Sequence, residues 1–353
     1  MKIFVTKPYL PPPEEYLKRV SEIFERDCLT NQGPELQELE INLVKYLGVK
    51  NLQYVTNGTI ALQLAIKALN ITGGEIITTP FSYVATVSSI LWENCTPVFV
   101  DIESDNFTID PEKIENAITN KTKAIMPVHV FGYACNVNKI EKIAKQYNLK
   151  VIYDAAHTFG ARYKGRALCD YGDISTLSFH ATKLFHTIEG GALITKDEKI
   201  NRKLDLMKRF GHNGDNHYML GINAKQDEFN AAMGNVNLQH IDSIITERMR
   251  LCKLYDTYLN GKIQRPKDQN DLDYNYAYYP ILFKNESSLI STFERLNDNG
   301  IFPRRYFYPT LNKLPYINSI TCEISEDISR RIACLPLFIG LTDELVRIIC
   351  ESI

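Results

Sequence analysis

The sequence lacks the features that mark several common classes of protein. Lys and Arg number 40 against 42 Asp and Glu, so the formal net charge is −2, without a long basic block. This balance argues against a non-specific nucleic-acid binder. No run approaches the roughly 18 apolar residues of a membrane span, and the first residues lack the apolar stretch of a signal peptide. A soluble, cytoplasmic protein without nucleic-acid or membrane partners is therefore expected.

The 8 cysteines show neither metal-binding nor redox spacing. No two stand as C-x-x-C, and H-x3-H and H-E-x-x-H are both missing. No metal site is therefore predicted, and reduced, mostly buried thiols are expected. Also missing are a G-x-G-x-x-G after the first strand, the Lys-Ser/Thr of a P-loop, and G-x-S-x-G. Nicotinamide-binding, nucleotide-hydrolysing and serine-hydrolase sites are disfavoured for this reason.

Short apolar runs alternate with helical patterns over the first part of the chain. The apolar runs span residues 52–56, 76–79, 97–101, 124–130, 151–154, 174–179 and 192–195. Helical patterns span residues 14–26, 35–47, 59–69, 83–93, 111–118 and 137–147. This alternation predicts an α/β domain with a mostly parallel sheet. Ligands of such sheets gather at the carboxyl ends of the strands.

The pattern changes after about residue 235. A long helix is predicted over residues 238–259, an aromatic strand over 274–283, and further helices over 289–299 and 342–352. These elements predict a smaller α+β domain over residues 236–353. Residues 1–235 then form the large domain together with an N-terminal arm.

An aspartate and a lysine follow two of the predicted strands. Asp154 ends the run 151–154, and Lys183 follows the run 174–179 shortly before Glu189-Gly190-Gly191. An amine can form a Schiff base with the aldehyde of pyridoxal phosphate (PLP), and a carboxylate can keep its pyridine nitrogen protonated. Burial of Lys183 would favour the reactive neutral amine. The alternatives are a cap of a helix start at Ala155-Ala156 for Asp154 and a solvated surface side chain for Lys183.

Other residues offer contacts for the rest of such a cofactor. Asn57-Gly58-Thr59 precedes a predicted helix, whose free N–H groups and dipole form an anion site, although the same residues would also suit an ordinary cap. Ser178 could add a hydroxyl to the same phosphate. His157 could contact the ring oxygen or simply pack, and an aromatic ring from Phe81-Ser82-Tyr83 could stack on the cofactor.

Six segments together resemble the DegT/StrS-type sugar aminotransferases. They span residues 56–62, 79–86, 127–132, 153–157, 178–183 and 221–225, in the family's order along nearly the whole chain. The resemblance implies PLP fold type I, the aspartate-aminotransferase-like fold. A dehydrating branch of the family carries histidine in place of the catalytic lysine, so Lys183 favours transamination. Lys225 departs from the family pattern, since many relatives carry Arg there.

The resemblance also implies a role for each candidate residue. Lys183 would bind the cofactor and act as the catalytic base, with Asp154 on the pyridinium nitrogen. Asn223 would reach the cofactor phosphate of a neighbouring subunit, which implies a homodimer with shared sites. The implied cofactor-binding residues are Gly58, Thr59, Tyr83, Asp154, His157, Ser178, Lys183 and Asn223.

The segment 304–309 resembles members that aminate C4 of dTDP-4-keto-6-deoxy-D-glucose. The implied reaction takes the amino group from L-glutamate, releases 2-oxoglutarate and passes through pyridoxamine phosphate (PMP). Its amino sugar would serve surface-polysaccharide (O-antigen, lipopolysaccharide) or related glycan synthesis. Candidate substrate residues are His180, Arg304, Arg305, Tyr306 and Tyr308. Amination at C3 of a 3-keto isomer, a GDP-linked 4-keto sugar, and a non-catalytic regulator on the same fold stay open as alternatives.

Overall fold

The computed structural model describes residues 2–317 and 320–353, which are built around a seven-stranded sheet. The only antiparallel strand among these seven is β10, which lies between β2 and β9. Each of the seven apolar runs forms one strand, which confirms the prediction of a mostly parallel sheet. In sheet order the strands are β2 (Asn51–Val55), β10 (Gly191–Thr195), β9 (Ile174–Ser178), β6 (Lys150–Asp154), β5 (Thr122–Met126), β3 (Glu75–Thr78) and β4 (Thr96–Phe99).

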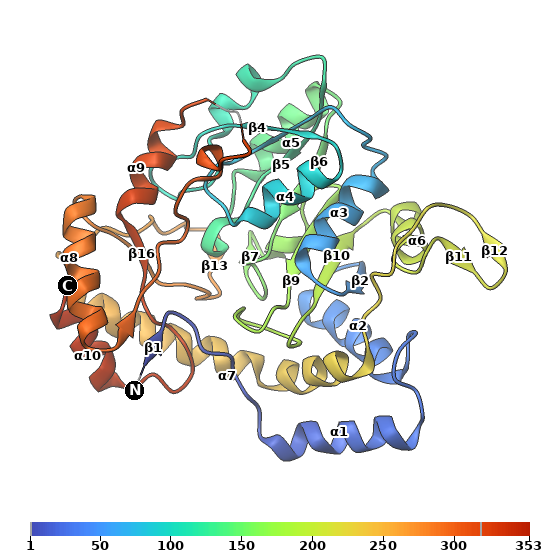
Figure 1. Ribbon diagram of the computed structural model, residues 1–353, viewed down its shortest axis with the longest axis horizontal. Helices are drawn as coiled ribbons and strands as arrows, with labels where there is room; N and C mark the ends of the chain where they lie inside the picture. Colours follow the sequence, from blue (N-terminus) through green and yellow to red (C-terminus); the bar gives the residue numbers. More distant parts are fainter. Residues whose placement is uncertain (1, 318–319) are drawn as a thin grey trace.

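Helices cover both faces of this sheet (Figure 1). On β10, Ala192 and Ile194 share a core with α2 (Pro34–Leu47) and α7 (Glu228–Leu259), whereas Leu193 shares one with α3 (Gly58–Ala68). Successive side chains of a strand point to opposite faces, so a strand covered on both faces has to be apolar throughout. This is why the sheet strands appear in the sequence as continuous apolar runs.

The remaining helices follow the sequence patterns in part. Those predicted include α1 (Pro13–Glu25), α4 (Val84–Trp92), α5 (Val137–Gln146), α8 (Glu286–Asp298) and α10 (Asp343–Glu351). Two helices were missed, α6 (Glu198–Met207) and α9 (Glu323–Arg331), and α7 begins earlier than predicted. The predicted helix 111–118 is wrong, because two 3-10 turns take its place. Within the described ranges, no helix is long and apolar enough to cross a membrane.

The C-terminal elements enclose a core of their own. Strand β14 (Pro280–Leu282) pairs with β16 (Ile332–Cys334), and β15 (Ile301–Phe302) pairs with the N-terminal β1 (Ile3–Phe4). Ile3 is buried in this core together with residues of α7, α8 and α10. Helix α7 runs without interruption across residue 235. The division into domains 1–235 and 236–353 stays a prediction.

The aromatic strand predicted over residues 274–283 is wrong for most of its length. Only β14 is a strand, and residues 274–279 form an irregular segment. The carbonyls of Tyr276 and Ala277 accept hydrogen bonds from the buried guanidinium of Arg248 on α7. These backbone groups are thus engaged by a side chain and not by a neighbouring strand.

Three short strands and one hairpin complete the fold. β7 (Arg162–Tyr163) pairs with β8 (Arg166–Ala167) and with β13 (Leu272–Asp273). The hairpin of β11 (His212–Asn213) and β12 (Asn216–His217) extends away from the sheet next to α6 (Figure 1).

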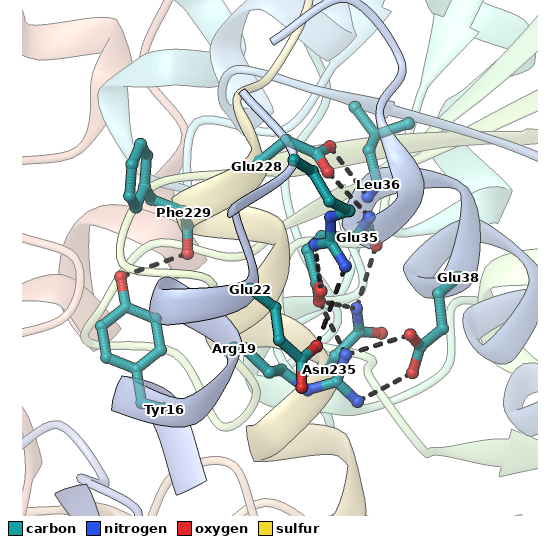
Figure 2. Close-up of polar contacts among 10 residues, drawn as sticks. Tyr16, Arg19, Glu22, Glu35, Leu36, Glu38, Glu228, Phe229 and Asn235 are labelled. Carbon is teal, nitrogen blue, oxygen red and sulfur yellow. Dashed lines mark hydrogen bonds and ion pairs between the residues drawn. The ribbon is translucent and has the colours of Figure 1, made fainter. Parts of the chain in front are cut away.

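A network of charged side chains attaches α1 to the rest of the molecule (Figure 2). Glu35, at the start of α2, accepts hydrogen bonds from Arg19 at 2.7 Å and from Arg26 at 2.9 Å. The buried Glu228, the first residue of α7, accepts the backbone N–H groups of Glu35 at 2.8 Å and Leu36 at 3.1 Å. A side chain of α7 therefore caps α2, whose own N-cap residue is a glycine.

We predict that Glu228→Gln destabilises the protein, because the new NH2 group faces a backbone N–H that has lost its acceptor. The free energy of unfolding, measured by urea titration, should fall by about 1–3 kcal/mol. The matched control is Glu38→Gln. Glu38 also forms an ion pair with Arg19, but its side chain is 45% exposed. The control should cost less than about 1 kcal/mol. Equal losses in the two variants would contradict the capping role of Glu228.

Candidate active site

Asp154 lies at the carboxyl end of β6 with its carboxylate buried. Oδ2 accepts the hydroxyl of Thr86 at 2.7 Å, and Oδ1 accepts the N–H of Ala156 at 3.2 Å. Ser82 and Thr86 lie 2.8 Å apart through their hydroxyls; since the Thr86 proton goes to Asp154, Ser82 is the donor in that contact. No helix starts at Ala155-Ala156, which the structure describes as part of a turn. Asp154 therefore does not cap a helix there, and the hydrogen bond from Ala156 uses only one acceptor position of Oδ1.

Burial raises the pKa of the Asp154 carboxyl, and three contacts act against this rise. They are the hydrogen bonds from Thr86 and Ala156 and the charge of Lys183. A carboxylate has about four lone-pair positions, so Asp154 keeps acceptor capacity for a further N–H donor. The pyridinium N–H of PLP is a donor of that kind, and its charge would favour the ionised carboxylate.

Lys183 lies in the loop after β9, the strand that pairs with β6. The backbone N–H of Lys183 donates to the backbone carbonyl of His180 at 2.8 Å, which forms a turn. Burial lowers the pKa of the Lys183 amine to about 8, against the opposing effects of Asp154 and Tyr83. Lys183 is half-buried and not fully solvated, so the surface side chain considered as the alternative describes it only in part. The lowered pKa gives the amine a larger neutral fraction near neutral pH than an ordinary lysine has.

An anion cradle forms where the N-terminus of α3 meets the end of β9. The Asn57 side chain accepts the N–H of Ile60 at 2.9 Å, which leaves the N–H groups of Gly58 and Thr59 for a ligand. A Cβ atom at Gly58 would lie only 3.0 Å from the Cβ of Ser178. Gly58 and the Ser178 side chain therefore border the same space, as a phosphate site of these residues requires.

Gly191, the first residue of β10, permits this close approach. It pairs with Val55 at the end of β2 and with Ser178 at the end of β9. A Cβ atom at Gly191 would lie 2.5 Å from the carbonyl carbon of Asn57 and 2.7 Å from the nitrogen of Gly58. The Gly-rich turn after Lys183 thus allows the N-terminus of α3 to pass over β10 and reach Ser178.

His157 is buried three residues after Asp154. Its Nδ1 accepts the N–H of Phe131 at 3.1 Å, so the neutral ring carries its proton on Nε2. Burial holds the pKa of His157 well below its ordinary value, and the charge of Lys183 lowers it further. The ring is therefore a neutral Nε2–H donor, which suits contact with the ring oxygen of PLP.

Tyr83 and Asn223 lie on the surface of the single chain. Tyr83, the residue before α4, is 60% exposed, so its ring is free to stack on a ligand. Asn223 is exposed in the segment between the β11–β12 hairpin and α7. Its backbone bridges Arg209, which fixes that segment to the end of α6. The stacking role of Tyr83 and the inter-subunit role of Asn223 stay predictions.

The five candidate substrate residues do not gather at one point. Tyr306 packs edge-on against Tyr278 at 5.8 Å between ring centroids, and the ring of Tyr278 lies 4.7 Å from that of His157. Burial, followed by the effect of Tyr278, raises the pKa of Tyr306 to about 12. Tyr306 is therefore connected to the cofactor-binding residues through one aromatic side chain.

The other four candidates have different surroundings. Arg305 forms an ion pair with Glu286 at 2.6 Å and lies 3.9 Å from the ring centroid of Tyr308. Arg304 is exposed. His180 is exposed too, with Nδ1 2.8 Å from the Thr182 hydroxyl and Nε2 3.5 Å from Glu189. The Arg304 guanidinium lies 5.4 Å from the ring centroid of Tyr306. The substrate roles of all five residues stay predictions.

Thr86 is the contact of this site that the sequence did not reveal. It is buried on the first turn of α4, three residues after the exposed Tyr83. Its hydroxyl is one of several in this segment of the sequence, and nothing local distinguishes it. Its role depends on the position of α4 next to the end of β6.

The sequence is similar to known proteins along nearly its whole length. The sequence model of the DegT/DnrJ/EryC1/StrS aminotransferase family matches residues 13–353. A dTDP-4-amino-4,6-dideoxy-D-glucose transaminase of Shigella dysenteriae is 41% identical over 99% of this chain and 98% of its own. A GDP-perosamine synthase of Escherichia coli O157:H7 is 34% identical over 95% of this chain and 93% of its own.

The fold is also similar to solved structures. The crystal structure of DesI, described in the presence of its TDP-sugar product, superposes with a TM-score of 0.94 at 28% identity. The superposition covers 99% of this chain and 92% of DesI. PseC of Helicobacter pylori, an aminotransferase involved in the biosynthesis of pseudoaminic acid, superposes with a TM-score of 0.91 at 26% identity over 100% of this chain and 98% of its own. The predicted PLP fold type I is confirmed by these similarities.

We predict that Lys183 reacts with an amine-directed acylating reagent as a group of lowered pKa. In the cofactor-free protein its labelling, followed by mass spectrometry, should reach half its maximum near pH 8, compared with about pH 10.4 for an ordinary lysine. Asp154→Asn should shift this midpoint to lower pH, because the Asp154 charge favours the protonated amine. A midpoint at the ordinary lysine value would contradict the burial of the amine.

Proposed function

Because this chain belongs to the DegT/DnrJ/EryC1/StrS aminotransferase family, we propose that it moves the amino group of L-glutamate to C4 of dTDP-4-keto-6-deoxy-D-glucose. The product would be dTDP-4-amino-4,6-dideoxyglucose, for surface-polysaccharide synthesis. The observation that carries the proposal is the 41% identity, over 99% of the chain, to a transaminase named for this product. The arrangement of Lys183, Asp154 and the cradle at Gly58 supports it.

PLP, when bound, supplies an aldehyde that captures amines and a ring that takes up electrons. The N–H groups of Gly58 and Thr59 and the hydroxyl of Ser178 would hold its phosphate. Asp154 would accept the N–H of the ring nitrogen, and His157 would donate Nε2–H to the ring oxygen. The N–H groups of Gly58 and Thr59 are left for a ligand by the Asn57 cap, and His157 carries its proton on Nε2. Both features suit these contacts.

Lys183 would carry the proton transfers. With a pKa of about 8, its released amine can take up the α-proton of glutamate and return a proton to the carbon next to the ring. The same two transfers in reverse would serve the keto sugar. Asp154 would have to be ionised for this role. Burial raises its pKa, and the hydrogen bonds from Thr86 and Ala156 and the charge of Lys183 act against that rise, as the charge of a pyridinium N–H would.

A GDP-linked 4-keto sugar is the second candidate substrate. The GDP-perosamine synthase, at 34% identity, favours it through its name. Amination at C3 of a dTDP-linked 3-keto sugar has less support, because the relative of 41% identity is named for a 4-amino sugar. The dTDP-linked 4-keto sugar ranks first because the identity to its named relative is higher.

We also infer a homodimer with shared sites. Four large apolar side chains around the β11–β12 hairpin are exposed, namely Phe210 (50%), Tyr218 (60%), Leu220 (84%) and Ile222 (41%). Apolar side chains gathered on a projecting segment are typical of an interaction surface. Asn223 follows Ile222 directly, so docking of this segment on a second copy would bring Asn223 to the partner's site.

Incubation with PLP, L-glutamate and dTDP-4-keto-6-deoxy-D-glucose tests the proposed reaction. We expect a C4 amine by NMR, and borohydride reduction should fix the cofactor to the Lys183 peptide. Lys183→Ala should retain PLP only non-covalently and lose turnover, because no other amine replaces it. No product despite bleaching of the cofactor by glutamate would refute the dTDP-4-keto substrate and redirect the test to the GDP-linked and 3-keto sugars.

Subunit complementation tests the shared site. Lys183→Ala and Asn223→Ala homodimers should each be weak or inactive. After the two variants are unfolded and refolded together, the mixed dimer would contain one site with both Lys183 and Asn223, so activity should reappear. Separately refolded samples mixed afterwards are the control. Recovery no greater than in that control would refute the contribution of Asn223 across the interface.

A further inference from the structure

The turn that carries His157 is held by the side chain of one residue far away in the sequence. Asn275 is buried, and its Nδ2 donates to the carbonyl of His157 at 2.8 Å and to that of Phe159 at 2.9 Å. Its Oδ1 accepts the N–H of Ala277 at 3.2 Å. Both amide protons and the oxygen are therefore used, and the turn has two of its carbonyls fixed to the C-terminal part of the chain.

Neighbours of Asn275 hold the other side of the His157 ring. The Tyr274 hydroxyl lies 2.9 Å from the carbonyl of Phe131 and 3.1 Å from that of Tyr278. The N–H of Phe131 is the donor to His157 Nδ1, and the Tyr278 ring packs on His157. The segment 274–278 thus holds His157 in three ways. Asn275 binds the backbone carbonyl of His157, Tyr278 packs on the imidazole ring, and Tyr274 binds Phe131, whose N–H fixes the tautomer of the imidazole.

The backbone at Phe131 is strained and the space around it is full. Phe131 has φ of +56°, a left-handed conformation that is uncommon for a bulky residue. Gly132 follows with φ of +93°, and a Cβ atom there would lie 2.8 Å from Asn275 Oδ1 and 3.1 Å from the His157 carbonyl oxygen. Asn275 and Gly132 therefore pack directly against the turn, and the surrounding contacts hold the unfavourable conformation in place.

Arg248 fixes the segment itself. Its guanidinium is buried and donates to the carbonyls of Tyr276, Ala277 and Leu337. Helix α7 thereby anchors residues 276 and 277, which directly follow Asn275. Asn275 is therefore attached to a rigid element. A residue held this firmly can determine the position of the turn that it binds.

We propose that Asn275 is a positioning residue, which places His157 so that Nε2–H meets the ring oxygen of the cofactor. The inference rests on the proposed function, since it assumes that PLP binds at this site. Asn275 acts through two backbone carbonyls and does not touch the cofactor itself. A variant without the Asn275 amide would keep the His157 imidazole, but the turn that orients this ring would no longer be fixed.

Truncation of Asn275 should be tolerated by the fold. Asn275, Gly160 and Ala161 line a cavity of about 360 Å³, together with Tyr46 and Arg162. Water from this cavity can satisfy the two carbonyls that lose the amide. Asn275→Thr has a similar side-chain volume, removes both amide donors and adds no charge, so it serves as the second variant if Asn275→Ala does not fold.

The first measurement needs no amino donor. The visible absorbance of the PLP-loaded protein is titrated with pH, and the midpoint reports the surroundings of the ring oxygen and of the lysine-linked nitrogen. Asn275→Ala and His157→Ala should move this midpoint in the same direction. Asn235→Ala is the matched control, because Asn235 is also a buried asparagine whose Nδ2 donates to a backbone carbonyl, that of Glu35 at 2.9 Å. An unchanged midpoint in Asn275→Ala would overturn the proposal.

A double-mutant cycle separates positioning from general loosening of the fold. The rate at which glutamate bleaches the cofactor should fall about 10- to 100-fold in Asn275→Ala. In the His157→Ala background the same change should alter the rate by less than about twofold, because Asn275 acts only through His157. Equal factors in both backgrounds would overturn the proposal. A wild-type protein that glutamate does not bleach would refute the amino donor instead, and the pH titration would still decide the role of Asn275.

Discussion

The burial of one carboxylate at the end of a central strand is the constraint on which the site depends. Burial of Asp154 raises the pKa of its carboxyl, and a buried charge needs partners to remain ionised. Thr86 from α4, the N–H of Ala156 and the amine of Lys183 supply them. Each partner comes from a different segment, so the position of α4, the turn after β6 and the loop after β9 are all fixed relative to this group.

A second constraint is the contact between the two parts of the chain. Aromatic and aliphatic side chains from the strand ends and from residues 277–334 share one core, which includes Phe81, Phe131, Tyr278 and Phe307. This core lies beside His157, whose ring is parallel to those of Phe131 and Phe307. The site is thus built at a junction, and the C-terminal part contributes to its geometry through Tyr278 and Asn275 rather than through the residues that bind the cofactor.

Sequence patterns predicted best the strands that are buried on both faces. Six of the seven sheet strands are buried along most of their length, so their apolar runs were unambiguous, whereas the edge strand β4 is partly exposed. The aromatic segment at 274–279 has the composition of a strand, but Arg248 takes the carbonyls of two of its residues. There a side-chain contact made over a long sequence distance overrides local propensity. The helix predicted over 111–118 divides into two 3-10 turns.

Local patterns were enough to predict the fold class. They also nominated Lys183 with Asp154 as a reactive pair and Gly58 with Ser178 as phosphate-binding residues, because these follow predicted strands and helix starts. The groups that set the charge and direction of these candidates could be found only from the arrangement of the chain in space. The Thr86 hydroxyl, the tautomer of His157 and the hold of Asn275 on its turn each join residues between 26 and 118 positions apart. Hydrogen bonds act over about 3 Å in space, and distance along the chain does not reveal which groups meet at that range.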